Sequence, residues 1–237
     1  MVDFHSHILP HMDDGPDSLD MSLAMLRRSF LQGVDVMVST SHFYADEEYP
    51  KTFLARREEA FARLQDAMLL SAEVYPRIVP GAEVLYFPGI SMAEEMAEFT
   101  IGGSCILVEP PMAPWSEEML DEIVLLGENL HCRPVVAHVD RYMRMLRDET
   151  LMDRVCRREL LVQVNGEYFL NPKTEKAAAR HLKNGDIYLI GSDCHNLDTR
   201  EPNLGPAWKR AKAMGLEAEF RALEKNALTL LGEKELL

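Results

Sequence analysis

Two pairs of potential metal ligands stand near opposite ends of the chain with the same spacing. His5 and His7 lie two residues apart in the run DFHSH, and Asp193 and His195 repeat this spacing in YLIGSDCH. Each pair follows a short apolar run that is typical of a strand. Residues two apart in a strand point to the same face. The two pairs therefore predict a metal site that is assembled from distant parts of the chain.

The segments that must position these pairs alternate between apolar, β-branched runs and runs with helical spacing. We expect strands at residues 2–4, 34–40, 77–79 continuing into 81–84, 105–108, 135–137, 160–164 and 187–190. A helix should follow the first strand, with Asp17 or Ser18 as its N-cap and Gly33 as its stop, and another should span residues 51–70. The alternation predicts an α/β fold with parallel strands, either a seven-stranded TIM-like barrel or a doubly wound open sheet.

Each expected strand ends on a polar residue. Along the chain these are His5 with His7, then His42, Glu83, Glu109, His138, Asn165, and Asp193 with His195. In a parallel barrel the strand ends share the face on which active sites are built, and Asp14 in the loop after the first strand reaches this face. Any one of these residues could be a helix cap or part of an ion pair, and turn chemistry before Gly15 explains at least one of Asp13 and Asp14. Together they predict a metal centre, whereas His11, His131 and His181 are expected in solvent.

The donor set indicates which metals would bind and what they would do. It comprises five imidazoles and four carboxylates, namely His5, His7, His42, His138 and His195 with Asp14, Glu83, Glu109 and Asp193. These donors suit two or three ions of manganese, iron or zinc better than calcium or magnesium, with Glu83 or another carboxylate as a bridge. Closely spaced divalent ions promote hydrolysis of phosphate esters or amides. Arg141 and Arg200 favour a phosphate, although each could instead pair with a nearby acid, Asp140 or Glu201.

Composition excludes several other functions. The 237 residues are consistent with a single domain spanning 1–237, and a net charge of −14 without a basic block disfavours nucleic acid as a partner. The four cysteines form no CxxC pair, no secretory signal is visible, and no apolar run approaches the roughly 20 residues that cross a bilayer. We therefore expect a soluble cytoplasmic protein without membrane insertion. Its apolar helix faces could serve the core or a homo-oligomer.

The combined motifs resemble a known family. They are DFHSHILP, DDGPDS, TSHF, GAEV, LVEPP, AHVDRY and GSDCHNLDTREP, spread over residues 3–205. This set is similar to the PHP superfamily, and within it to the CpsB/CapC-type protein tyrosine phosphatases of bacterial capsule and exopolysaccharide systems. The resemblance implies a distorted seven-stranded β/α barrel with a trinuclear manganese or iron site. It also implies hydrolysis of phosphotyrosine on a cognate tyrosine kinase that controls polysaccharide export.

The resemblance carries over to individual residues. The nine donors named above match the family's metal ligands, and Arg141 and Arg200 match its phosphate-binding arginines. His11, Asp140 and Cys194 depart from the usual pattern, but none of them removes a ligand. Because His11 lies in the loop beside the site, it bears on substrate preference.

Three alternatives stay open. One is a phosphatase for a small metabolite such as histidinol phosphate, although the DDG loop and the HNLDTREP segment favour the tyrosine phosphatase branch. A second is an amidohydrolase or a metal-dependent deoxyribonuclease, which also begin with an HxH strand. Against these, the fourth strand ends in Glu109 rather than a bridging lysine, and a nuclease should carry more positive charge near its site. The third is a non-catalytic barrel, in which lost ligands would be expected.

Overall fold

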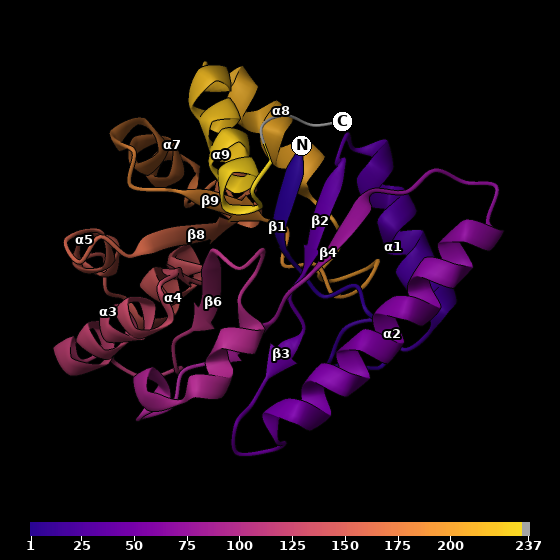
Figure 1. Ribbon diagram of the computed structural model, residues 1–237. Coiled ribbons are helices and arrows are strands. Elements are labelled where there is room, and N and C mark those ends of the chain that lie inside the picture. The colour runs from indigo at the N-terminus through magenta and orange to yellow at the C-terminus, as the bar shows by residue number, and fades with distance from the viewer. Residues whose placement is uncertain (234–237) are drawn as a thin grey trace.

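The computed structural model describes residues 1–233, in which parallel strands alternate with helices (Figure 1). The strands are β1 (Val2–Ser6), β2 (Val36–Ser39), β3 (His42–Phe43), β4 (Arg77–Pro80), β5 (Glu83–Leu85), β6 (Cys105–Glu109), β7 (Arg133–Val136), β8 (Leu161–Asn165) and β9 (Leu189–Gly191). The helices are α1 (Leu19–Leu31), α2 (Pro50–Leu70), α3 (Glu117–Leu130), α4 (Val139–Leu146), α5 (Leu151–Cys156), α6 (Glu167–Leu170), α7 (Glu175–Asn184), α8 (Leu204–Ala213) and α9 (Glu217–Leu230), with 3₁₀ helices η1 (Ile90–Met92) and η2 (Glu94–Phe99). Among residues 1–233, no helix is both long and apolar enough to span a membrane.

Two of the expected strands are interrupted. The strand expected at 34–40 is β2 alone, and β3 follows after a break at Thr40 and Ser41; the next segment is likewise divided into β4 and β5 around Gly81. One sheet has the order β1-β2-β4 and the other β3-β5-β6-β7-β8-β9. Backbone hydrogen bonds bridge the break, because the N–H of Gly81 donates to Ser39 O at 2.8 Å and that of Glu83 to Ser41 O at 3.1 Å. The chain therefore bends at these points without losing its pairing.

The parallel sheet curls because β1 has neighbours on both sides. It pairs with β2, and its end also contacts the segment after β9, where His7 N–H donates to Cys194 O at 2.9 Å and Asp193 N–H to His5 O at 2.8 Å. Figure 1 shows α1 and α2 together on one side of the strands, with α3, α4 and α5 on another. The predicted α/β fold with a parallel sheet is confirmed in this form. The curl also brings the two ends of the sequence pattern, His5 to His7 and Asp193 to His195, next to each other.

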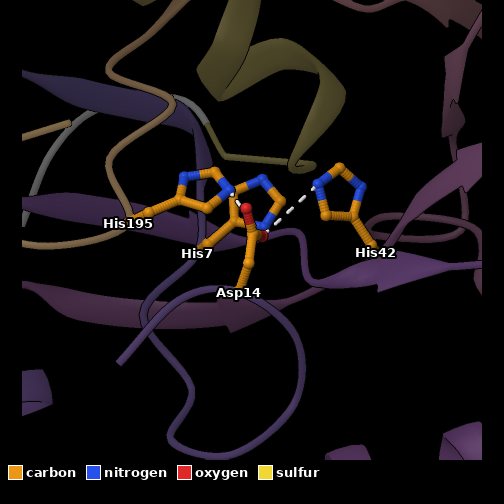
Figure 2. Close-up of side chains that lie close together, drawn as sticks. All are labelled: His7, Asp14, His42 and His195. Carbon is orange, nitrogen blue, oxygen red and sulfur yellow. Dashed lines mark ion pairs between the residues drawn. The ribbon is translucent and has the colours of Figure 1, made fainter. Parts of the chain in front are cut away.

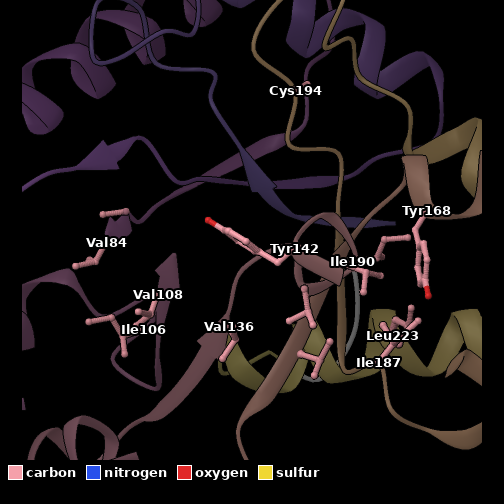
Figure 3. Close-up of a cluster of buried hydrophobic side chains, with 14 of the residues drawn as sticks. Val84, Ile106, Val108, Val136, Tyr142, Tyr168, Ile187, Ile190, Cys194 and Leu223 are labelled. Atoms are coloured by element: carbon pink, nitrogen blue, oxygen red, sulfur yellow. The ribbon is translucent and has the colours of Figure 1, made fainter. Parts of the chain in front are cut away.

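Alternate residues of a strand contribute to two different apolar clusters. In β6, Ile106 and Val108 pack in the larger cluster, part of which is drawn in Figure 3, whereas Leu107 packs in a smaller cluster with Ala227 and Leu228 of α9. A strand that is buried on both faces has a continuous apolar sequence, as is usual for the strands of parallel sheets. Buried polar residues therefore stand out at the ends of these strands.

The ends of the first helix follow the expected signals. The Ser18 side chain caps α1 by accepting a hydrogen bond from the Met21 N–H at 3.3 Å, and Gly33 follows the helix with a φ of 88°. The helix expected at 51–70 is α2, which begins at Pro50. The predicted N-cap at Ser18, the stop at Gly33 and the second helix are confirmed.

Replacing Gly127 of α3 with alanine should destabilise the fold without touching the strand ends. A Cβ at this position would lie 2.5 Å from the Pro134 Cδ atom and 2.9 Å from the Cys132 carbonyl oxygen. We expect overpacking to cost about 1–3 kcal/mol, which exceeds the gain of about 1 kcal/mol from better helix propensity. Urea unfolding measures the change, with the exposed neighbour Glu128→Ala as a control that should shift little. A higher midpoint for Gly127→Ala would contradict the packing argument.

Candidate metal centre

All nine predicted ligands come together, most of them just beyond the carboxyl ends of strands and two, His42 and Glu83, at the first residues of β3 and β5. Their nitrogen and oxygen atoms form four overlapping groups, in each of which the atoms lie within 4.8 Å of one another: His7, Asp14, His42 and His195; His5, His7 and Asp193; His5, Glu83 and His138; His42, Glu83 and Glu109. Shared residues join the groups, so we refer to these nine side chains as the donor cluster. The geometric expectation that distant motifs share one site agrees with this arrangement.

Glu83 occupies the centre of the donor cluster. Its side chain is completely buried at the start of β5. One carboxylate oxygen lies 2.8 Å from His138 Nε2. The other lies 3.0 Å from His5 Nε2 and 3.2 Å from both His7 Nε2 and His42 Nδ1. Glu83 therefore contacts four imidazoles, which is the position that a bridging carboxylate requires.

The solvent side of the donor cluster is formed by the group drawn in Figure 2. The Asp14 Oδ1 atom lies 3.1 Å from His195 Nε2 and 3.8 Å from His42 Nε2, along the dashed lines. The Asp14 side chain is 64% exposed, whereas that of His195 is only 1% exposed. The cluster is thus open to solvent beside Asp14 and closed behind the histidines.

The donor cluster fits divalent transition-metal ions. His42 Nδ1 and His195 Nε2 are buried and make no hydrogen bond within residues 1–233, and His5 Nε2 faces His7 Nε2 at 3.2 Å. Buried polar atoms without partners cost free energy. Imidazole nitrogens with free lone pairs, next to carboxylate oxygens, are the ligands that manganese, iron and zinc accept.

Opposite charges within the donor cluster shift the pKa values of its histidines. Burial alone would lower the pKa of His7, but the carboxylates of Asp13 and Glu83 outweigh it and raise that pKa to about 10. Burial is likewise outweighed at His138, where Glu83 and Glu109 raise the pKa to about 10. The carboxyl pKa of Glu83 moves the other way: burial favours the neutral acid, but the charges of His5 and His138 lower the pKa well below its usual value.

Metal binding should weaken as the pH falls. Because the pKa values of His7 and His138 are about 10 without metal, both rings hold a proton at neutral pH that a metal ion must displace. The affinity for Mn²⁺ should rise about tenfold per pH unit for each displaced proton between about pH 6 and 8. Calorimetric titration in buffers of different ionisation enthalpy counts the released protons. An affinity that does not change with pH would contradict this expectation.

The two predicted arginines lie beside the donor cluster. Arg200 Nη2 lies 2.7 Å from Asp193 Oδ1 and its Nη1 lies 3.4 Å from Asp14 Oδ2, while Arg141 Nη1 lies 3.8 Å from Asp193 Oδ2. Both arginines line a cavity of about 440 Å³ that also borders Asp193 and Asn165. Guanidinium groups on such a cavity can receive an oxyanion next to the cluster.

The alternative partners proposed for these arginines are occupied elsewhere. The Glu201 carboxylate pairs with Arg28 at 2.7 Å. The buried Asp140 carboxylate accepts a hydrogen bond from the Asn165 N–H at 3.0 Å. Simple ion pairs with Glu201 or Asp140 therefore do not explain the placement of Arg200 and Arg141.

Two members of the donor cluster have left-handed backbone. His138 has a φ of 31° and Asp193 a φ of 53°. Such conformations cost about 1–3 kcal/mol each in residues other than glycine, and they concentrate at functional sites. Both are held by neighbours, since the His138 N–H donates to Gln163 Oε1 at 2.6 Å and the Asp193 N–H to His5 O at 2.8 Å. Strand periodicity gives no signal for these bends.

The sequence pattern missed two residues behind the donor cluster. Asp13 makes the expected turn contact with the Gly15 N–H at 3.0 Å, but its other oxygen also lies 2.7 Å from His7 Nδ1. Gln163 is completely buried in β8 and lies 3.1 Å from His5 Nδ1. A glutamine within the apolar run LVQVN was the available signal.

The remaining histidines and Cys194 fall outside the donor cluster. His11 and His131 are both exposed, as expected. The expectation that His181 lies in solvent was wrong: it is buried in α7, with Nδ1 2.8 Å from Asp186 Oδ2, because this acid satisfies its ring. Cys194 is buried in the larger apolar cluster and belongs to none of the four ligand groups.

Comparison with known proteins identifies the family. Residues 1–232 match the family described as Capsular polysaccharide synthesis, CpsB/CapC. The tyrosine-protein phosphatase CpsB of Streptococcus pneumoniae is 31% identical, with 88% of each chain covered, and that of Streptococcus agalactiae is 28% identical, with 98% of each covered. A chain from the crystal structures of the metal-dependent tyrosine phosphatases YwqE of Bacillus subtilis and CpsB of S. pneumoniae has the same fold, with a TM-score of 0.84 at 22% identity over 100% of this chain and 96% of that one. This chain belongs to the CpsB/CapC family of capsular polysaccharide synthesis.

Proposed function

We propose that this protein is a metal-dependent protein tyrosine phosphatase that acts on a tyrosine kinase of capsular or exopolysaccharide biosynthesis. The observation that carries the proposal is a complete donor cluster beside two arginines on one open cavity. Relatives that cover nearly the whole chain are tyrosine-protein phosphatases, which supports the reaction. The family's role in capsule synthesis supports the choice of kinase as substrate.

We assign the nine side chains of the donor cluster as ligands of two or three divalent ions. Four overlapping ligand groups support more than one ion, and the mixture of imidazole and carboxylate favours manganese, with iron or zinc as alternatives. Such ions lower the pKa of bound water and offset the charge of a phosphate. Glu83 is the bridging ligand in this assignment because it contacts four imidazoles.

Arg141 and Arg200 hold the non-bridging oxygens of the phosphate in this proposal. Their guanidinium groups approach Asp193 from the cavity, where they stabilise negative charge that develops at phosphorus. The Asn165 Nδ2 atom donates to Asp193 Oδ2 at 2.9 Å and so holds this carboxylate in place. A phenolate leaving group is more stable than an alkoxide, so an aryl phosphate requires little help from a general acid.

The finer architecture belongs to the same proposal. If β2 with β3 and β4 with β5 each count as one bent strand, the pairings support a distorted seven-stranded barrel. A single domain over residues 1–237 stays part of the proposal, of which residues 234–237 lie outside the described part of the chain. The four free cysteines support a reducing compartment, and we propose the cytoplasm. Assembly into a homo-oligomer stays a prediction that light scattering on the purified protein would check.

Hydrolysis assays with purified protein and Mn²⁺ test the reaction. We expect turnover of an aryl phosphate and of a phosphotyrosine peptide, loss of turnover with a chelator, and recovery when Mn²⁺ is added back. A phosphoserine peptide and histidinol phosphate serve as comparison substrates. Preferential turnover of histidinol phosphate would support the metabolite phosphatase instead. Absence of phosphotyrosine hydrolysis by metal-loaded protein would refute the proposal.

A further inference from the structure

Two buried side-chain oxygens contact the donor cluster from behind in the same way. Asp13 Oδ2 lies 2.7 Å from His7 Nδ1 and accepts a hydrogen bond from the His42 backbone N–H at 2.9 Å. Gln163 Oε1 lies 3.1 Å from His5 Nδ1 and accepts one from the His138 backbone N–H at 2.6 Å. Each oxygen thus ties the ring of one histidine in the HxH pair to the backbone of a ligand from another part of the chain, His42 of β3 or His138 at the start of α4.

The orientation of the Gln163 amide is fixed by its other contacts. Its Nε2 atom donates to the Val164 carbonyl oxygen at 2.8 Å and to Asn165 Oδ1 at 3.1 Å. The His138 N–H can only donate, so the atom facing it must be the amide oxygen. The same oxygen faces His5, and the proton of that contact therefore resides on His5 Nδ1.

The oxygen behind each ring accepts a hydrogen bond from Nδ1, so the opposite ring nitrogen, Nε2, is available to bind a metal ion. With Nδ1 protonated, it is the Nε2 atoms of His5 and His7 that face the donor cluster, where both lie within 3.2 Å of Glu83 Oε2, and a metal ion that binds there displaces any proton they carry. Hydrogen bonds from the far nitrogen of a ligand histidine commonly fix its tautomer and its orientation. Gln163 extends this control further, since Asn165 in turn donates to Asp193 Oδ2 at 2.9 Å.

We propose that Asp13 and Gln163 are positioning residues, which hold the protons of His7 and His5 on Nδ1 and lock these rings to His42 and His138. The inference rests on the proposed metal centre and deepens it. Asp13 positions His7 in the ligand group that contains Asp14 and His195. Gln163 positions His5 in the ligand group that contains Glu83 and His138. The negatively charged carboxylate of Asp13 makes His7 a stronger metal ligand than the neutral amide of Gln163 makes His5.

Substitutions that remove or keep the accepting oxygen test this proposal. Gln163→Leu and Asp13→Ala remove it, whereas Gln163→Glu and Asp13→Asn keep one oxygen at the same distance along the side chain. We expect the first two to weaken Mn²⁺ binding about 10- to 100-fold, and Gln163→Glu to restore most of the affinity. Gln32→Leu is the matched control, because this half-buried glutamine hydrogen-bonds to Pro202 and Gly205 outside the cluster.

Nitrogen NMR of the histidine rings in Zn²⁺-loaded protein supplies a readout that general destabilisation would not change. Wild-type protein should show His5 and His7 protonated at Nδ1, and this signature should be lost at His5 in Gln163→Leu and at His7 in Asp13→Ala. If a variant fails to fold, Asp13→Asn and Gln163→Glu still report the tautomer. Wild-type affinity and tautomers in Gln163→Leu and Asp13→Ala would overturn the inference, whereas wild-type protein that binds no metal would overturn the proposed function itself.

Discussion

Replacement of Glu83 by glutamine is expected to lower kcat/KM for an aryl phosphate by at least about 10³-fold, which corresponds to about 4 kcal/mol. The side chain is completely buried and contacts four imidazoles, so its charge neutralises the centre of the cluster. The glutamine side chain has nearly the same shape but lacks this charge, and a neutral amide is a weaker metal ligand than a carboxylate. Metal content should fall together with activity, because Glu83 belongs to two of the four ligand groups.

A remote glutamate provides the control for this experiment. Glu175 on α7 pairs with Arg210 on α8 at 2.5 Å, and neither residue belongs to the donor cluster or lines its cavity. Glu175→Gln should therefore retain metal content and turnover. Elemental analysis and steady-state kinetics on both variants separate loss of the metal from a general loss of stability. A Glu83→Gln protein with full metal content and normal kcat/KM would eliminate the bridging role.

Substitution of Arg200 by alanine should lower kcat/KM about 10²- to 10³-fold while the metal content stays close to that of the wild type. The guanidinium lies between Asp193 and Asp14 on the cavity, where it is 31% exposed and can exchange an internal contact for a phosphate oxygen. Arg200→Lys should recover only part of the rate, since an ammonium group cannot reproduce the forked contact of a guanidinium.

Arg210, the partner of Glu175 in this ion pair, provides the matched control for Arg200→Ala. Arg210→Ala removes a similarly exposed guanidinium that does not line the cavity, and it should leave kinetics unchanged. Inhibition by inorganic phosphate gives a second readout, because loss of Arg200 should weaken it if this side chain holds phosphate. Unchanged turnover and unchanged phosphate inhibition in Arg200→Ala would show that the arginine only supports Asp193.

Local sequence patterns were sufficient to predict most elements and the members of the donor cluster. Ligand-type residues at the ends of apolar runs predicted the nine side chains, and parallel pairing predicted that they would share one face. The same patterns failed where the chain departs from regular geometry. The breaks at Thr40 and Gly81 and the left-handed backbone at His138 and Asp193 do not follow from periodicity. His181 was misplaced because its partner Asp186 satisfies it only once α7 is folded.

What the sequence determined by itself is the chemistry available at this site, because residue types fix which atoms can bind metal and phosphate. Only the tertiary structure decided which of these atoms meet. The curl that joins His5 and His7 to Asp193 and His195 depends on hydrogen bonds between residues nearly two hundred positions apart in the chain. Gln163 acquires its role in the same way, since its hydrogen bond to the far side of the His5 ring exists only after β1 and β8 have found their places.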